Sequence, residues 1–118
     1  MKALLIKTGN TRPEVIDIDG EYQQLSDTVG GYIESLYIPT VPIGAHAYIN
    51  EDGKMLGLSM NPFATIVGHE LIGISPSDYI AGNMIVLGDG EDGEEADVPQ
   101  TVVDSIMNLL SSENSDYA

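Results

Sequence analysis

The alternation of apolar and polar residues along the chain predicts mainly β-strands. Strands are expected at residues 2–7, 14–18, 32–38, 45–49, 55–60 and 84–87. Residues 14–18 alternate apolar and acidic side chains, which is typical of a strand with one buried face. A turn at residues 8–10 precedes them, so we expect a hairpin with residues 2–7. The turn at residues 50–54 is expected to lead into a second hairpin, with residues 55–60 as its returning strand.

Helical spacing replaces this alternation in two short segments. Tyr22, Leu25 and Val29 fall on one helix face, with Asp19 before them as the expected cap. Gly30-Gly31 is expected to end this helix in a structural turn, and one of the two glycines should have a positive φ angle. Asn61-Pro62 is expected to open a second short helix that ends at Gly68.

A longer amphipathic helix is expected at residues 98–110, after a capping box formed by Asp97 and Gln100. Its apolar side is Val102, Val103, Ile106, Leu109 and Leu110. Residues 111–118 are polar and are expected to form a C-terminal tail. These elements predict a single α+β domain at residues 1–110, with a small, mainly antiparallel sheet, two or three short helices and a C-terminal amphipathic helix.

The size and composition fit such a domain. A chain of 118 residues with 42% hydrophobic residues can bury a core without disulfides or a structural metal. There is no cysteine, which excludes a disulfide framework, a thiolate metal site and a cysteine nucleophile. The N-terminal apolar run is too short for a signal peptide, and no stretch is long enough to span a bilayer. We therefore expect a cytoplasmic protein.

Charge adds the first indication of function. Four Lys and Arg residues oppose nineteen Asp and Glu residues, a net charge of −15. Such a surface repels nucleic acid and anionic membranes and favours encounter with basic proteins. The alternative is that the acidity only keeps a small protein soluble.

Four segments of the chain carry a resemblance to a known family. They are VGGYIE at 29–34, NEDGK at 50–54, Leu58 with Asn61 and Ala64, and Asp78, Ile80 and Gly82 before MIVLG. Together they resemble a family of small uncharacterised proteins that are common in phages of actinobacteria and other Gram-positive hosts. The resemblance spans residues 22–88. It implies a phage or mobile-element origin, hence the host cytoplasm, and it implies no activity.

The motifs that would indicate catalysis or metal binding are missing or incomplete. His69-Glu70 would need a second histidine at the position of Gly73 to form a zinc-protease helix. The acidic run at residues 89–95 lacks the ligand order of an EF-hand, and a solvated, mobile loop explains it better. No nucleophile elbow, phosphate-binding loop or dinucleotide fingerprint occurs. We expect no catalytic residue, metal or cofactor.

The remaining candidate chemistry is the acidic surface. The carboxylates expected to contact a partner lie at two turns and in the acidic loop: Asp17, Asp19, Glu21, Glu51, Asp52, Asp89, Glu91, Asp92, Glu94 and Glu95. The expected partner is a host protein with a basic, nucleic-acid-binding site, such as a restriction or CRISPR effector. The chain would inhibit it as a DNA mimic in an anti-defence role.

Two other functions stay open, as does homo-oligomerisation. One is sequestration of a small molecule or nucleotide signal in a pocket near Gly30, Gly31 and Asn61. The other is an accessory structural role in a phage.

Overall fold

The strands form one sheet in the computed structural model, which describes residues 1–9, 12–39 and 44–116, with side chains up to Ser111. The strands are β1 Lys2–Ile6, β2 Glu14–Asp17, β3 Ile33–Ile38, β4 Ala45–Asn50, β5 Met84–Asp89 and β6 Glu95–Ala96. They pair in the order β2-β1-β5-β4-β3, and β6 pairs with the end of β5. All of these pairs are antiparallel, which confirms the predicted α+β class and the β1–β2 hairpin.

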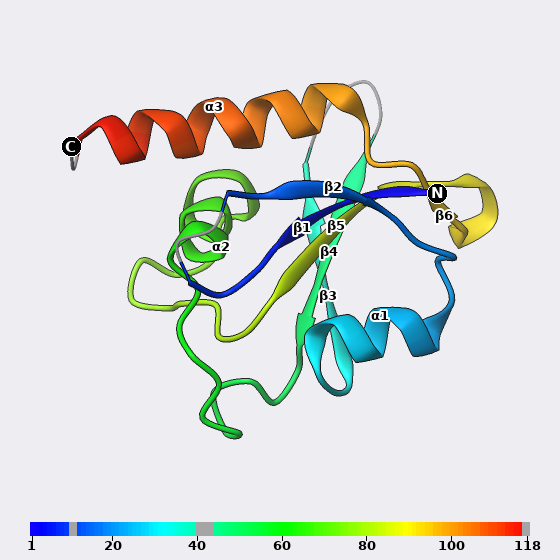
Figure 1. Cartoon of the computed structure of the whole chain (residues 1–118), viewed down its shortest axis with the longest axis horizontal. Helices are drawn as coiled ribbons and strands as arrows, with labels where there is room; N and C mark the ends of the chain where they lie inside the picture. Colours follow the sequence, from blue (N-terminus) through cyan, green and yellow to red (C-terminus); the bar gives the residue numbers. More distant parts are fainter. Residues whose placement is uncertain (10–11, 40–43, 117–118) are drawn as a thin grey trace.

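Helices cover both faces of this sheet (Figure 1). The helices are α1 Tyr22–Val29, α2 Pro62–Val67 and α3 Gln100–Asp116, with a π-helical turn η1 at Gly68–Ile72 and a 3₁₀ turn η2 at Glu91–Gly93. Helices α2 and α3 pack on the face that carries Met84 and Val86. Helix α1 packs on the opposite face, against Ile85 and Leu87. The continuous apolar run of β5 is therefore buried on both sides, as expected of a central strand.

The predicted strand at residues 55–60 is wrong. Strand β4 pairs with β3 on one side and with β5 on the other, so both of its edges are occupied. The chain instead forms a hydrogen-bonded turn after β4, in which the Leu56 amide donates to the Asp52 carbonyl. Met60 then makes only a single bridge, to Ala81.

The short helices differ from the prediction at their ends. The residue before α1 is Glu21, which makes no side-chain cap, while the Asp19 carboxylate accepts from the Glu21 amide at 2.8 Å. Asn61 caps α2 as predicted. Helix α2 ends at Val67 with Gly68 as its C-cap, as predicted, but the Gly68 backbone is helical and the chain continues as η1 to Gly73, whose φ is +92°. Gly68 also permits close packing, since a Cβ there would lie 2.8 Å from the Ile74 Cδ1.

Helix α3 is longer than predicted and starts differently. It runs through Asp116, beyond the predicted end at Leu110. The predicted capping box is wrong, because the Asp97 carboxylate accepts from the Lys2 amide at 2.8 Å. The Gln100 side chain donates to Asp104. The predicted apolar side is buried except at Leu109, which is half-buried.

The predicted positive φ is confirmed at Gly30, where it is +85°. Gly30→Val should destabilise the protein by about 1 kcal/mol or more, because a β-branched side chain is strained in this conformation. Gly30→Asn should cost less, since asparagine tolerates the left-handed region. Urea unfolding of both variants measures the difference. Equal free energies of unfolding for Gly30→Val and the unchanged protein would contradict the expectation.

Candidate functional site

Two buried asparagines fix the segments around the ends of the sheet. Asn61 is fully buried, and its amide donates to the carbonyls of Ile6 and Gly82 at 2.9 and 3.0 Å. Its side-chain oxygen accepts from the Ala64 amide at 3.0 Å. The Asn61 side chain is therefore occupied within the chain and does not face a ligand.

Asn50 has the same role at the end of β4. It is 3% exposed, donates to the Val29 carbonyl at 3.1 Å and accepts from the Asp52 amide at 2.8 Å. Gly31 packs against it, and a Cβ there would lie 2.9 Å from the Asn50 Nδ2. Of the three residues predicted to line a small-molecule pocket, only Gly30 borders a shallow pocket, whereas Gly31 and Asn61 do not line it.

The turn after β4 borders a groove of about 290 Å³, the turn groove. Its acidic side chains are Glu34, Glu51, Asp52 and Asp78. Its apolar lining includes Leu36, Ile49, Ile74 and Ile80. Glu51 and Asp52 are predicted partner contacts, whereas Glu34 and Asp78 come from distant parts of the chain and were missed. The groove thus combines an apolar floor with a carboxylate-rich rim.

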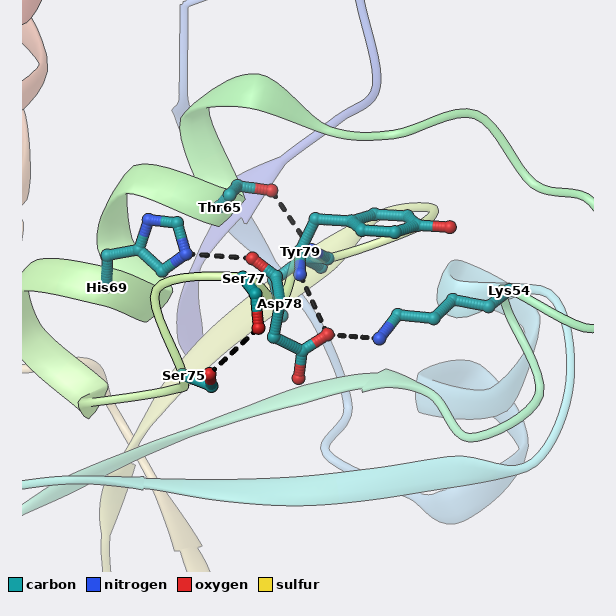
Figure 2. Close-up of polar contacts among 8 residues, drawn as sticks. Lys54, Thr65, His69, Ser75, Ser77, Asp78 and Tyr79 are labelled. Atoms are coloured by element: carbon teal, nitrogen blue, oxygen red, sulfur yellow. Dashed lines mark hydrogen bonds and ion pairs between the residues drawn. The ribbon is translucent and has the colours of Figure 1, made fainter.

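Lys54 also lines this groove, and its ammonium points to the Asp78 carboxylate (Figure 2). Its ammonium pairs with Asp78 and lies 4.8 Å from the centre of the Tyr79 ring. The hydrogen bond between them raises the pKa of Lys54 and lowers the pKa of Asp78, because each group stabilises the charged form of the other. Both side chains are half exposed, so this pair orders the turn more than it stabilises the fold.

The segment that carries Asp78 is itself attached to α2 and η1 (Figure 2). The His69 Nε2 donates to the Asp78 carbonyl at 2.8 Å, and the Thr65 hydroxyl accepts from the Ile80 amide at 3.0 Å. His69 therefore has a backbone partner, and it is not among the residues that line the turn groove. Within the described residues, no cluster of three or more histidine and carboxylate side chains suits a metal ion.

The acidic loop, residues 88–97, is anchored to the sheet at its second half, which the sequence did not predict, while its tip is solvated as expected. Its β6 segment pairs with β5, placing Ala96 opposite Gly88 and Glu95 opposite Asp89. Turn η2 lies between β5 and β6, and Asp92 has a left-handed φ of +51° there. Glu91, Asp92 and Glu94 stay exposed on this turn.

A histidine on β4 joins this loop to the sheet through the His46 cluster, which consists of His46, Tyr48, Asp89 and Glu95. The two ring nitrogens of His46 lie 2.5 Å from the Asp89 Oδ1 and the Glu95 Oε1. The Tyr48 hydroxyl donates to the other Glu95 oxygen at 2.5 Å. Contacts to carboxylates on both sides suit an imidazolium, which donates through both nitrogens. Sequence reasoning missed the cluster, and the only signal was that His46 and Tyr48 share one face of a strand.

Tyr48 should make the stability of the protein depend on pH in the alkaline range. Burial, and then the hydrogen bond to Glu95, raise the pKa of Tyr48 well above its ordinary value of 10.0. The neutral phenol is thus favoured by folding, so this contribution is complete below pH 10.0 and is lost as the pH rises above it. Tyr48→Phe should flatten the alkaline decline in the free energy of unfolding. Urea titrations on either side of pH 10.0 test this, with exposed Tyr22→Phe as the control.

The predicted partner-binding carboxylates fall into two groups. The turn at residues 17–21 lies beside the acidic loop, because a Cβ at Gly20 would lie 3.6 Å from the Glu95 Cβ. Asp17 lies opposite Lys2 in the β1–β2 strand pair, and the Lys2 backbone amide donates to the Asp97 carboxylate of the loop. Asp89 and Glu51 flank opposite ends of β4, and its six residues span roughly 20 Å. The structure therefore joins Asp17, Asp19 and Glu21 to the acidic loop and keeps Glu51 and Asp52 apart from them.

Comparison with known proteins identifies the family of the chain. Residues 1–111 match the family model described as "Domain of unknown function (DUF3846)". The searches of curated proteins and of solved structures gave no match. Among the described residues, no helix has both the length and the apolar character needed to cross a membrane. The match covers nearly the whole sequence, so the chain belongs to the DUF3846 family, whose function is unknown.

Proposed function

We propose that the protein is a non-enzymatic phage or mobile-element product that binds a basic, nucleic-acid-binding site on a host protein. The observation that carries this proposal is that carboxylates lie at both ends of β4, on backbone segments that are held in place by hydrogen bonds. The turn groove has four carboxylates and one lysine, and that lysine is paired with Asp78. Lys7 lies outside this groove, and its ammonium is also occupied, 3.7 Å from the Glu14 carboxylate. One lysine cannot balance four carboxylates, so the turn groove keeps a negative electrostatic potential.

Carboxylates on anchored backbone can occupy the positions that phosphates take on a basic protein surface. Because the acidic loop is attached to β5 and His46, little conformational entropy is lost when it meets a partner. An inhibitor of a restriction or CRISPR effector, acting as a DNA mimic in the host cytoplasm, would work in this way. The resemblance of the 29–34 and 50–54 segments to phage proteins supports the same biological setting.

The test begins with affinity purification of the tagged protein from its host and continues with surface plasmon resonance against the captured partner. Association should slow as salt rises, because exposed charges are screened beyond about 10 Å at 0.1 M salt. Glu51→Lys and Glu94→Lys should each reduce the association rate by on the order of tenfold. Asp104→Lys makes the same charge change on α3 and should have a smaller effect. An affinity that responds neither to salt nor to these reversals would reject the proposal.

A further inference from the structure

Strand β3 leaves one edge of the sheet open. It pairs with β4 alone, and no described strand lies on its other side. The Glu51 amide donates to the Tyr32 carbonyl, which fixes the alternation of hydrogen bonds along this antiparallel pair. Glu34, Leu36 and Ile38 therefore bond to β4, while the amides and carbonyls of Ile33, Ser35 and Tyr37 point away from the sheet.

The two faces of this open strand border two different grooves. Glu34 and Leu36 line the turn groove on the face that carries α2 and α3. Ser35 and Tyr37 line a second groove of about 290 Å³ on the opposite face, the tyrosine groove. Its other lining residues include Tyr48, His46, Asp89 and Glu94. A strand added beside β3 would place alternate side chains on these two faces.

Charge decides which kind of strand fits. Both grooves carry carboxylates, at Glu34, Glu51 and Asp52 on one face and at Asp89 and Glu94 on the other. A second copy of the chain would bring another net charge of −15 to the same edge, so self-pairing is opposed by repulsion. A segment rich in lysine or arginine would be attracted instead.

The other edge of the sheet lacks these features. Strand β2 has only four residues and follows Pro13. Neither groove is lined by a β2 residue. Ile16 and Ala3 form a hydrogen-bonded pair between β2 and β1. Because bonded positions alternate along an antiparallel strand, the amide and carbonyl of the neighbouring Val15 point away from the sheet. The β2 edge is therefore a matched control for β3.

We infer that an extended, basic segment of a protein partner adds as a strand to the open edge of β3, with alternate side chains in the turn groove and the tyrosine groove. This inference rests on the proposed function, and it identifies β3 as the contact surface and a basic extended segment as the part of the partner that binds there. Main-chain hydrogen bonds to Ile33, Ser35 and Tyr37 would supply register. Contacts of the segment's basic side chains with the carboxylates of the groove they enter would supply selectivity.

The probe for this inference is a synthetic peptide of alternating lysine and valine with the length of β3. Hydrogen exchange should slow at the amides of Ile33, Ser35 and Tyr37 when the peptide binds. Methylation of the peptide amides that face β3 should weaken binding at least tenfold, and this test leaves the protein unchanged. A glutamate–valine peptide should not bind.

Protein variants test the same edge. Ser35→Pro removes an outward amide without removing a β3–β4 hydrogen bond, so it should abolish binding of the lysine–valine peptide while the fold is kept. Val15→Pro makes the same change on β2 and should leave binding intact. If the peptide binds in a salt-dependent way and neither amide methylation nor Ser35→Pro weakens its binding, strand addition is overturned but the proposed function stands. Loss of peptide binding in Ser35→Pro, together with a host partner indifferent to charge reversal, would reject the proposed function alone.

The remaining outcomes concern the occupant of the edge. Self-association of the chain that protects the same three amides would identify a second copy as the occupant and would overturn the inference. Failure of the lysine–valine peptide to bind the unchanged protein at low salt would overturn it as well.

Discussion

Asn61→Ala is expected to lower the free energy of unfolding by about 3–5 kcal/mol, since it removes a helix cap and takes a hydrogen-bond donor away from two buried carbonyls. The side chain is fully buried and makes hydrogen bonds to three segments of the chain, through Ile6, Ala64 and Gly82. Alanine would replace these hydrogen bonds with a small cavity. The carbonyls of Ile6 and Gly82 would each lose a donor in a buried position, although the Ile6 carbonyl keeps its place opposite Met84 in the β1–β5 pair. Urea unfolding monitored by circular dichroism measures the loss.

Two variants make this prediction specific. Asn108→Ala changes the same residue type at an exposed position of α3 and should alter stability by less than about 0.5 kcal/mol. Asn61→Asp keeps the acceptor for the Ala64 amide but loses both donors and introduces a buried charge, so it should be no more stable than Asn61→Ala. A loss below about 1 kcal/mol for Asn61→Ala would show that the surrounding carbonyls find other partners.

His46→Leu is expected to release the acidic loop from the sheet and to cost about 2–3 kcal/mol, less than a fully buried ion pair. The side chains of His46 and Glu95 are 13% and 16% exposed, whereas Asp89 is 41% exposed. Without the imidazole, the Asp89 and Glu95 carboxylates would face each other across a partly buried site with no ring nitrogen between them. Hydrogen exchange at residues 90–96 should therefore accelerate in this variant.

Matched changes separate the cluster from the loop's overall charge. His46→Gln can donate to one carboxylate and should recover part of the stability. Glu91→Gln removes one charge from the exposed turn η2 and should leave hydrogen exchange in the loop unchanged. Unaltered exchange at residues 90–96 in His46→Leu would mean that the β5–β6 pairing alone anchors the loop.

The sequence predicted well wherever a pattern is local. The apolar run at Met84–Leu87 located the central strand, and the Asn61-Pro62 pair located the start of α2. The left-handed Gly30 followed from a helix pattern that stops beside a strand pattern. In each case the physical constraint acts between residues that are near in sequence, so it can be read without the fold.

The errors arose where a local signal competed with a distant partner. Residues 55–60 could not return along β4, because β5 already occupied that edge. Asp97 has the spacing of a cap, but the Lys2 amide takes its carboxylate. Gly68 caps α2 as its residue type predicts, yet helical backbone continues beyond it as η1, and Gly68 also permits close packing against Ile74.

By itself, the sequence determined the fold class, the central strand, the short-range turns and the excess of negative charge, because composition and periodicity act along the chain. Only the tertiary structure decided how those charges are arranged. It brought Glu34 and Asp78 to the Glu51 turn, and it placed His46 between two carboxylates that lie more than forty residues away in sequence. It also left β3 as an open edge, since strand order depends on which segments pair across the sheet.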